Sequence, residues 1–513
     1  MPTLGQILDR NAVCYPDEVA IVFEDRHISH RTHAERVRRL AAALYAAGLR
    51  RQDRVAILAM NCVEYLEAYG AAACAGYILG TVNYRYAPPE IAYVLKDIAP
   101  RVLIFEAQYA DIVAALRPGL AEIELFVCIG DGPEWAIAYE DLLARGDIAG
   151  PPIRATAEDC LCLIYTSGTT GRPKGVIHTN HADAKLAEVL AVELSLPVDG
   201  RFLVIMPLFH IGARSLQMAQ HWRGGTVVLH RKFDPPAVLR TIERERITGI
   251  HLAPTMVQAV LDVADFDRHD RSSLRTLLYA AAPMPLALLK RGLAAFGPVF
   301  VNGYGLTEGN GTFMHQHQHR LHGTPAQVKR LQSVGQAHPQ AELRITDERG
   351  ELCPTGQPGE VWIRSETCMA GYWNNTIATL ATIRDGWVAT GDVGYLDEEG
   401  YLFLVDRKKD MIISGGENIY CREVEEAVAA HPAVHDVAVI GVPDDYWGEA
   451  VKAIVVPAPG ARIEPAELIA HARSLIAPYK CPKTIEFVAE LPRLPTGKIN
   501  KVTLREQYSA NRR

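Results

Sequence analysis

The sequence lacks any Cys-x-x-Cys pair, although ten cysteines are spread over its 513 residues. A disulfide framework and a structural zinc site of the usual spacing are therefore excluded. No run of 18 apolar residues occurs, because Asn61, Glu64 and Glu67 interrupt the most apolar stretch, and we expect no membrane span. The amino terminus lacks the basic start and apolar core of a secretory signal, so a cytoplasmic protein is expected.

Positive charge is also not in excess. Lys and Arg number 53 against 60 Asp and Glu, a net charge of −7, and no long basic run occurs. This argues against a dedicated nucleic-acid-binding protein. With 49% apolar and 22% charged residues, the composition excludes collagen-like, coiled-coil and disordered chains. At roughly 150 residues per domain, the length predicts about three domains, or one large domain and a smaller one.

Short apolar runs alternate with helical patterns from about residue 30 to 300. The runs that predict buried strands are 55–58, 102–105, 160–165, 202–206, 226–229, 276–279 and 299–302. The patterns that predict helices between them are 31–47, 181–193, 236–245, 255–263 and 285–296. Such alternation predicts an α/β fold with parallel sheets covered on both faces.

The pattern changes after about residue 340. Short strands with Gly-rich turns are predicted at 342–345, 360–363, 387–389 and 400–405, with a hairpin turn at 397–400. They predict a small, barrel-like antiparallel subdomain. The last 100 residues predict a small α+β domain, with helices at 422–430 and 465–475 and strands at 434–442, 451–456 and 484–488. We place the boundary at the charged tetrad 406–409, which gives domains of residues 1–405 and 410–513.

The strongest local signal is the segment 165–175, which reads YTSGTTGRPKG. It follows a predicted strand and offers backbone N–H groups, hydroxyls and the Lys174 cation, the parts of a phosphate cradle. It is not a Walker A loop, because Gly175 follows Lys174 where that motif has Ser or Thr. The alternative is a flexible surface loop, since Gly, Ser and Thr are common loop residues.

Three further segments carry candidate groups. In the segment 302–308, NGYGLTE, Glu308 could hold Mg²⁺ and Tyr304 offers a flat face for a base, but the full dinucleotide pattern is absent. Asp392 and Arg407 could hold ribose hydroxyls, although each alone is more often a turn residue or a surface ion pair. Lys498 ends a Pro-flanked loop, LPTGK, and by itself is an ordinary surface lysine.

Together and in this order, these segments resemble the acyl-adenylate-forming superfamily of acyl-CoA synthetases, peptide-synthetase adenylation domains and beetle luciferases. The resemblance covers about residues 5–505. It implies a large amino-terminal domain and a small mobile carboxyl-terminal domain, in agreement with the boundary at 406–409.

The resemblance implies a binding site for ATP and AMP, with Mg²⁺ held by Glu308 and Thr170. It places the following residues at the nucleotide: Thr166, Ser167, Gly168, Thr169, Thr170, Gly171, Lys174, Ala281, Ala282, Pro283, Asn302, Gly303, Tyr304, Gly305, Thr307, Asp392 and Arg407. Ala280 to Pro283 has Ala where the family more often has Gly beside adenine. Tyr304 would stack on adenine, Thr307 would contact the α-phosphate, and Asp392 and Arg407 would bind the ribose.

The resemblance also implies two half-reactions. A carboxylate displaces pyrophosphate from ATP, with Lys498 bridging the carboxylate and the α-phosphate, and a thiol then releases AMP from the acyl adenylate. The carboxyl-terminal domain would swing about the hinge residue Lys409 between the two steps. Ser414, Gly415 and Gly416 would lie beside the pantetheine arm of CoA, where glycine lets the backbone approach closely.

His210, in the segment MPLFH, is implied to lie beside the acyl carboxylate or to gate the thiol channel; the alternative is a buried histidine with a structural partner. The implied acyl pocket contains His210, Ile211, Gly212 and Gly305. No acidic residue stands where amino-acid activators hold an ammonium group. A medium- or long-chain fatty acid and an aromatic or cinnamate-like acid would both suit such a pocket.

Several alternatives remain open at this point. The thiol could belong to CoA or to a carrier protein, although we expect no carrier domain in this chain, and oxygen is the acceptor in luciferases. A non-catalytic relative would be expected to lack Lys174, Glu308 or Lys498, and all three are present. A homodimer is compatible with the sequence. Alternation along 315–319 would put three histidines on one face of a strand as a metal site, but a solvated loop is the default expectation.

Overall fold

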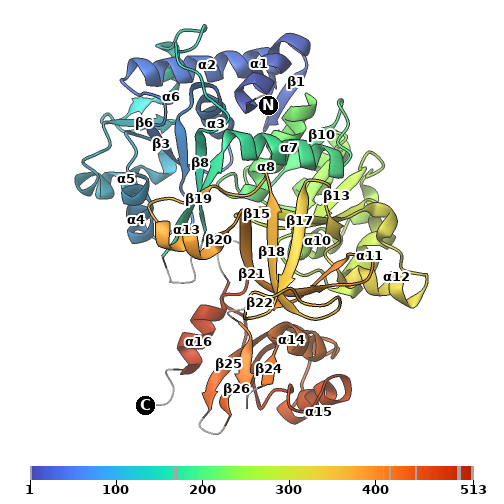
Figure 1. The fold of residues 1–513 in the computed structure, drawn as a ribbon. Coiled ribbons are helices and arrows are strands. Elements are labelled where there is room, and N and C mark those ends of the chain that lie inside the picture. The colour runs from blue at the N-terminus through green and yellow to red at the C-terminus, as the bar shows by residue number, and fades with distance from the viewer. Residues whose placement is uncertain are drawn as a thin grey trace. The chain divides into compact units, whose positions relative to one another are not determined.

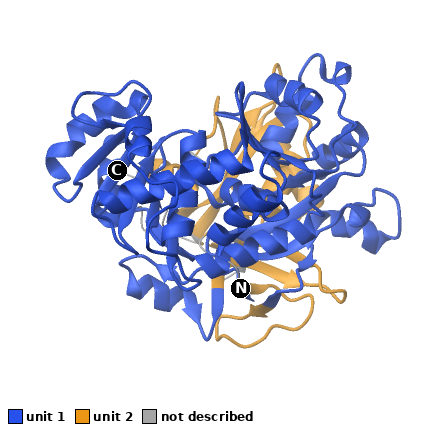
Figure 2. Cartoon of the chain, turned by 90° about the horizontal axis from the view of Figure 1, so that it is seen from above, with its two compact units in different colours: residues 1–343, 363–388 blue, residues 344–362, 389–513 orange. Residues whose placement is uncertain are grey.

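The computed structural model describes residues 3–166, 172–407, 410–414, 417–444, 447–493 and 498–509. The chain divides into two compact units, which Figure 2 shows in different colours. Unit 1 contains residues 1–343 and 363–388, and unit 2 contains residues 344–362 and 389–513. Among the helices of the described ranges, none is both long enough and apolar enough to cross a bilayer.

The first sheet of unit 1 has eight strands in the order β19-β9-β8-β4-β3-β5-β6-β7. Figure 1 labels β19, β8, β3 and β6 of this sheet. Its central pairs are parallel, and β9 joins it antiparallel to β8. The strands are β3 (Arg54–Leu58), β4 (Ile78–Thr81), β5 (Val102–Glu106), β6 (Leu125–Ile129), β7 (Ile137–Ala138), β8 (Cys160–Thr166), β9 (Lys174–Thr179) and β19 (Gly371–Tyr372).

The second sheet of unit 1 has nine strands in the order β16-β15-β14-β13-β12-β10-β11-β1-β2. Its centre, from β14 to β1, is parallel. The strands are β1 (Val19–Phe23), β2 (Arg26–Ser29), β10 (Arg201–Val204), β11 (Thr226–Leu229), β12 (Gly249–Leu252), β13 (Thr276–Tyr279), β14 (Phe300–Leu306), β15 (Gly309–Met314) and β16 (Gln336–Ala337).

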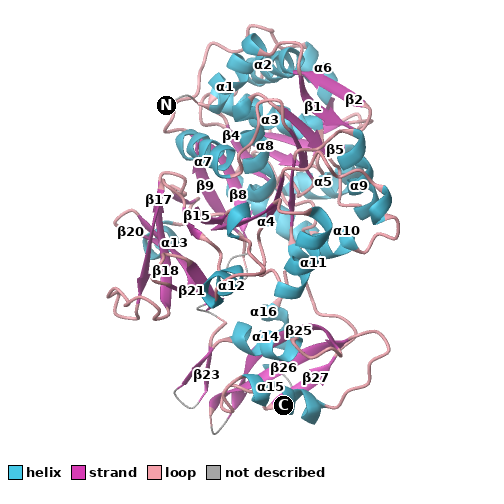
Figure 3. Ribbon diagram, turned by 90° about the vertical axis from the view of Figure 1, so that its right-hand side faces the viewer, coloured by secondary structure: helices cyan, strands magenta, loops and turns pink. Residues whose placement is uncertain are grey.

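Helices cover both sheets (Figure 3). They are α1 (Leu4–Cys14), α2 (His30–Ala46), α3 (Val63–Ala75), α4 (Pro88–Ile98), α5 (Ala110–Leu116), α6 (Tyr139–Ala144), α7 (Asn180–Glu193), α8 (Ile211–Arg223), α9 (Pro235–Arg244), α10 (Pro254–Leu261), α11 (Leu286–Phe296), α12 (Pro325–Lys329) and α13 (Thr376–Thr382). Side-chain caps start several of them; the Thr179 hydroxyl, for example, accepts from the Ala182 N–H ahead of α7.

The packing of unit 1 forms layers. One apolar cluster joins α2, α3, α7 and α8 to the inner faces of both sheets, so these helices form a shared middle layer. A second cluster packs α9, α10 and α11 against the outer face of the nine-stranded sheet. A third packs α4 and α5 against the outer face of the eight-stranded sheet. Each sheet is therefore buried on both sides, as the continuous apolar strands predict.

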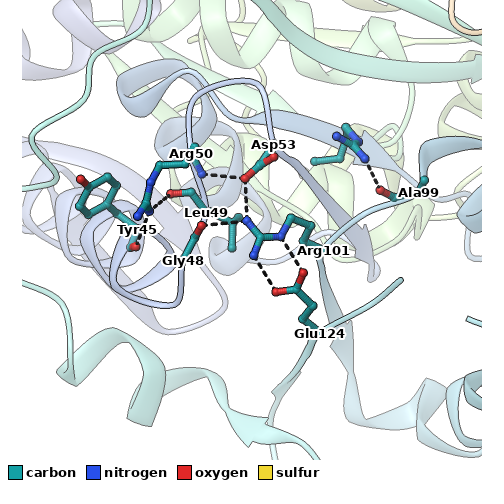
Figure 4. Close-up of polar contacts among 9 residues, drawn as sticks. Tyr45, Gly48, Leu49, Arg50, Asp53, Ala99, Arg101 and Glu124 are labelled. Atoms are coloured by element: carbon teal, nitrogen blue, oxygen red, sulfur yellow. Dashed lines mark hydrogen bonds and ion pairs between the residues drawn. The ribbon is translucent and has the colours of Figure 1, made fainter. Parts of the chain in front are cut away.

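The amino ends of the parallel strands β3, β5 and β6 are joined by Arg101 (Figure 4). Its guanidinium donates to the Gly48 carbonyl and to Asp53, both at 2.8 Å, and forms two hydrogen bonds with Glu124 at 2.9 and 2.7 Å. The Arg50 N–H also donates to Asp53. This network joins the loops at the amino ends of these strands. Ligands in such folds bind at the opposite, carboxyl ends of the strands.

A five-stranded sheet follows, with the order β17-β18-β21-β20 and β22 paired to β21. Its strands are β17 (Ala341–Thr346), β18 (Gly359–Ser365), β20 (Ile383–Arg384), β21 (Trp387–Leu396) and β22 (Leu402–Arg407). The predicted hairpin turn joins β21 to β22. The Asp397 carboxylate accepts from the N–H groups of Glu399 and Tyr401, and Gly400 adopts a φ of +79° that favours glycine.

The carboxyl-terminal part of unit 2 contains a second five-stranded sheet and, over its described residues, three helices. Its strand order is β24-β23-β26-β25, and β27 pairs parallel with β26. The elements are β23 (Ile412–Ser414), β24 (Glu417–Ile419), α14 (Cys421–Ala429), β25 (Val434–Asp444), β26 (Gly448–Pro457), α15 (Pro465–Leu475), β27 (Thr484–Phe487) and α16 (Lys501–Ser509). The predicted α/β fold with a small α+β carboxyl-terminal part is confirmed. The domain boundary at 406–409 stays a prediction.

Among the predicted strands that were too short, two concern candidate groups. The run 299–302 is the start of β14, which continues to Leu306, and 387–389 is the start of β21, which continues to Leu396. The candidate groups Tyr304 and Asp392 therefore lie within strands and not in the loops after them. The full lengths of these strands could not be predicted from the sequence, because glycine normally weakens a strand and they contain glycines at 303, 305, 391 and 394.

Candidate active site

The predicted phosphate loop joins β8 to β9 in unit 1. Thr166 and Lys174 lie directly opposite each other in the antiparallel ladder, so the ladder closes the base of the loop. Ser167, Gly168, Thr169, Thr170 and Gly171 lie outside the described residues. Gly175 packs against the Tyr165 ring, where a Cβ atom would lie 3.0 Å from Cζ. The Tyr165 hydroxyl in turn donates to Asp97 at 2.6 Å.

Tyr372, on β19, connects this loop to Glu308. The Lys174 Nζ atom lies 5.1 Å from the centroid of the Tyr372 ring, and the Tyr372 hydroxyl donates to Glu308 Oε1 at 2.7 Å. Burial and the Glu308 charge raise the pKa of Tyr372, so the phenol stays protonated as a donor. Lys174, from the eight-stranded sheet, and Glu308, from a hairpin of the nine-stranded sheet, thus both contact the Tyr372 side chain.

The backbone around Tyr372 fixes that geometry. Tyr372 pairs with Val176 on β9, and the Trp373 N–H donates to the Gly175 carbonyl at 2.7 Å. The Met369 N–H donates to the Glu308 carbonyl at 2.9 Å. The segment around β19 therefore bridges the end of the predicted phosphate loop and the turn that carries Glu308.

The second predicted motif forms the hairpin between β14 and β15. Tyr304 is 8% exposed and Thr307 is 7% exposed, whereas Gly305 is exposed and Glu308 is half-buried. A Cβ atom on Gly305 would lie 3.0 Å from the Gly309 carbonyl oxygen, so the tight hairpin favours glycine there. Asn302 and Gly303 lie on the same strand, with Asn302 next to Tyr279 of β13.

The predicted adenine segment directly follows β13. Ala281 has a φ of +72°, in the left-handed region that favours glycine, and Ala281, Ala282 and Pro283 are exposed. Such a conformation costs a non-glycine residue roughly 1–2 kcal/mol. Ala281 therefore holds the backbone shape that the commoner glycine would adopt without strain.

His210 forms the amino-terminal cap of α8. Its Nδ1 atom accepts from the Gly212 N–H at 3.2 Å, so the neutral ring carries its proton on Nε2. Ile211 and Gly212 form the first turn of α8, and all three residues are half-buried. The positive end of the helix dipole and an imidazole donor are thus placed at one point.

The loop before His210 is held by Asn61, in the loop after β3, and by Tyr69 of α3. Asn61, 2% exposed, donates to the carbonyls of Met206 and His230, both at 3.0 Å, and accepts from the Leu208 N–H at 2.8 Å. The Tyr69 hydroxyl donates to the Leu208 carbonyl at 2.9 Å. These contacts fix the position of the His210 backbone.

The remaining predicted site residues lie in unit 2. Asp392 is 5% exposed, and its backbone lies directly opposite that of Arg407 in the β21–β22 ladder. Ser414 is 8% exposed at the end of β23, and Lys498 is exposed next to the bridge between Arg493 and Ile499. Lys409, Gly415 and Gly416 lie outside the described residues.

The comparisons with known proteins decide the family. Residues 8–373 match the AMP-binding enzyme family, and residues 423–498 match the AMP-binding enzyme C-terminal domain. This chain is an AMP-binding enzyme. The resemblance to the acyl-adenylate-forming superfamily is confirmed.

Named relatives span nearly the whole of this AMP-binding enzyme. A feruloyl-CoA synthase of Amycolatopsis sp is 40% identical, with 98% of this chain and 99% of that protein covered. An indoleacetate–CoA ligase of Aromatoleum aromaticum is 38% identical, with 98% of each covered. The solved structure of the anthranilate CoA ligase AuaEII with anthranoyl-AMP has a TM-score of 0.90 at 30% identity, covering 99% of this chain and 98% of that one.

The histidine segment of this AMP-binding enzyme differs from the alternating strand considered from the sequence. Residues Gln316–Gln318 form a 3₁₀ turn, in which His315 and His317 stack with ring centroids 6.0 Å apart. His319 is not solvated: it is 8% exposed and lies 2.9 Å from the Tyr279 hydroxyl. Within the described ranges, no group of three or more His, Cys, Asp or Glu side chains is arranged to hold a metal.

Sequence reasoning missed two groups near the site. Tyr372 lies in the run GYW, which no chemical pattern distinguishes from a core segment. His251 lies in a short apolar strand and would be taken for a core residue. In this AMP-binding enzyme both adjoin predicted site residues, Tyr372 at Glu308 and His251 at Gly212.

Proposed function

We propose that this enzyme is an ATP-dependent carboxylic acid–CoA ligase with an aromatic acid as its substrate. It is an acid–thiol ligase that forms AMP, in agreement with its family and with the relatives that match over 98% of the chain. The choice of an aromatic acid over a fatty acid is supported by the feruloyl, indoleacetate and anthranoyl groups named in its relatives.

The observation that carries the proposal is the placement of Lys174 and Glu308 around Tyr372. A triphosphate repels an incoming carboxylate, so adenylation needs positive charge at the phosphates. Lys174 supplies a cation at the end of the loop, and Glu308 supplies the single carboxylate that Mg²⁺ usually takes from a protein beside phosphate oxygens. The Tyr372 hydroxyl orients that carboxylate through the 2.7 Å hydrogen bond.

Magnesium, when bound, would neutralise phosphate charge. Glu308 fits it by chemistry, and Thr170 is the second residue we propose for it. Lys174 would bind the β- and γ-phosphates and Thr307 the α-phosphate. Asp392 and Arg407 would bind the ribose hydroxyls, and the exposed backbone of Ala281 to Pro283 would border the adenine.

We place His210 at the carboxylate group of the acid, where the reaction takes place. Its Nε2–H can donate to an oxygen of the acid carboxylate and later to the carbonyl oxygen of the acyl adenylate. The α8 amino terminus adds the positive end of its dipole at the same place. Both groups favour the negative charge that grows on the carbonyl oxygen when a thiol attacks.

Lys498 would act in the first half-reaction by holding the carboxylate against the α-phosphate. Ser414, Gly415 and Gly416 would border the thiol arm of CoA in the second. The hinge at Lys409, the domains 1–405 and 410–513, a cytoplasmic location and a homodimer remain predictions.

The test is AMP release from ATP with a panel of acids, with and without CoA. The panel contains acetate, octanoate, palmitate, benzoate, phenylacetate, indoleacetate, cinnamate and ferulate. We expect AMP release that depends on CoA and is fastest with one aromatic acid. CoA-dependent release fastest with palmitate would correct the substrate class. Pyrophosphate release that ignores CoA would favour the alternative, an adenylating enzyme that loads a carrier protein.

A further inference from the structure

His251 is a buried histidine beside the predicted acyl pocket. It lies on β12, between β10 and β13 in the nine-stranded sheet, and is 5% exposed. Neither Nδ1 nor Nε2 of its ring has a hydrogen-bond partner among the described residues. Buried polar atoms are nearly always paired, and an unpaired one costs free energy, so a buried ring with two unpaired nitrogens calls for an explanation.

The ring faces the first turn of α8. A Cβ atom placed on Gly212 would lie 3.4 Å from His210 Nδ1, 3.4 Å from His251 Cε1 and 3.8 Å from His251 Nδ1. Gly212 has no side chain, so no Cβ atom occupies the position beside the Cε1–Nδ1 edge of His251. His210 and Gly212 are only half-buried, and this turn is the wall assigned to the acyl pocket.

Apolar side chains lie on the neighbouring strand and in the layer that contains α8. Its parallel neighbour on β13 is Leu278, and Ala213 and Leu216 of α8 lie in the apolar cluster of that layer. Burial, and then the nearby His210, lower the pKa of His251 to about 4. At neutral pH the ring is therefore uncharged, with one N–H donor and one acceptor nitrogen.

We propose that His251 is a specificity-determining residue that forms a hydrogen bond with a hydroxyl group on the aromatic ring of the acid. This inference rests on the proposed function. A hydroxyl can donate to the acceptor nitrogen or accept from the N–H, so it suits a neutral imidazole in either tautomer. A second carboxylate would require a cation, which an uncharged His251 does not provide.

A site built to bind a hydroxyl discriminates strongly against the analogue without it, because the protein group is then left unpaired. An apolar wall discriminates far less between the same two acids. The ratio of kcat/KM for a hydroxylated acid to that for its unsubstituted parent therefore measures the role of His251. This ratio is independent of how much of a variant is folded, because both acids are tested on the same preparation.

The experiment compares 3- and 4-hydroxycinnamate with cinnamate, and 3- and 4-hydroxyphenylacetate with phenylacetate, by CoA-dependent AMP release. The variants are His251→Leu, which removes both polar atoms, and His251→Gln, which keeps a donor and an acceptor. The matched control is His33→Leu, a buried histidine on α2 that is 3% exposed.

For the unchanged enzyme we expect at least one hydroxylated acid to be preferred by about tenfold or more over its parent. His251→Leu should lower that preference about tenfold, mainly through the hydroxylated acid, His251→Gln should retain part of it, and His33→Leu should leave it unchanged. Activity on these aromatic acids with no preference for the hydroxyl, or an equal preference in His251→Leu, would overturn the role of His251 alone. No CoA-dependent AMP release with any acid would overturn the proposed function as well.

Discussion

The buried ion pair between Arg214 and Asp183 permits a quantitative prediction. Arg214 lies on α8, one turn after His210, and is 1% exposed; Asp183 lies on α7 and is 0% exposed. The guanidinium donates to Asp183 and lies 4.7 Å from the Tyr69 ring centroid. His178 Nδ1 lies 3.2 Å from the other Asp183 oxygen. Arg214 and Asp183 therefore join α8 to α7, and His178 connects this pair to β9.

Replacing Arg214 with Met keeps a long apolar side chain but leaves the Asp183 charge uncompensated. Removal of one partner of a buried pair costs about 3–5 kcal/mol, a large part of the 5–15 kcal/mol by which proteins of this kind are stable. Burial alone raises the pKa of Asp183, but Arg214 and then His178 bring it below its ordinary value. In the unchanged protein this contribution is therefore present above about pH 4 and is lost as the pH falls.

In the Arg214→Met variant, the effect of pH on the stability contributed at this site has the opposite sign. Without Arg214, burial raises the pKa of Asp183, so the folded variant takes up a proton there and its penalty shrinks as the pH falls. Urea unfolding followed by tryptophan fluorescence at pH 8.0 and 5.5 measures both effects. We expect the difference from the unchanged protein to be larger at pH 8.0.

The double variant Asp183→Asn with Arg214→Met separates charge from packing. Removing the carboxylate charge should restore most of the lost free energy of unfolding and abolish the pH dependence of the difference. A double variant as unstable as Arg214→Met alone would refute the electrostatic account and assign the loss to packing.

Three further predictions concern the site. Tyr372→Phe keeps the ring beside Lys174 but removes the hydrogen bond to Glu308. The rate of ATP–pyrophosphate exchange should therefore fall about tenfold, while binding of the acid is unchanged. An unchanged exchange rate would show that Glu308 does not depend on this hydrogen bond for its orientation. Ala281→Gly should raise the free energy of unfolding in urea by about 1 kcal/mol, and a loss would show that its φ of +72° is not strained. Lys498→Ala should slow adenylate formation about 100-fold yet leave thioester formation from supplied adenylate nearly unchanged; equal loss of both would contradict the two-step role.

The sequence predicted the regular parts of the fold well. Strands β11 and β13 have the predicted bounds, and α7, α9 and α15 agree within one residue, because a single period dominates each segment. The motif residues could be found because Thr166, Lys174, Tyr304 and Glu308 occur in ordered, spaced segments. Their roles came from a family resemblance and not from periodicity.

Other features could not be predicted, for physical reasons. Every residue of α3 is buried, including Glu64 and Glu67, so the helix has no polar face to reveal its period. Glu67 is instead paired with Arg36 of α2 at 2.5 Å. Tyr372 and His251 reach the site through contacts between elements distant in sequence, and no local pattern encodes such contacts.

The pairing of β19 with β9 also has a consequence for synthesis of the protein. β9 forms an edge strand of the eight-stranded sheet until residues 371 and 372 leave the ribosome, long after the other strands of that sheet have been made. An unpaired edge is open to pairing with other chains. In the nascent chain, the edge formed by β9, next to the predicted phosphate loop, is therefore open to misassociation until late in synthesis.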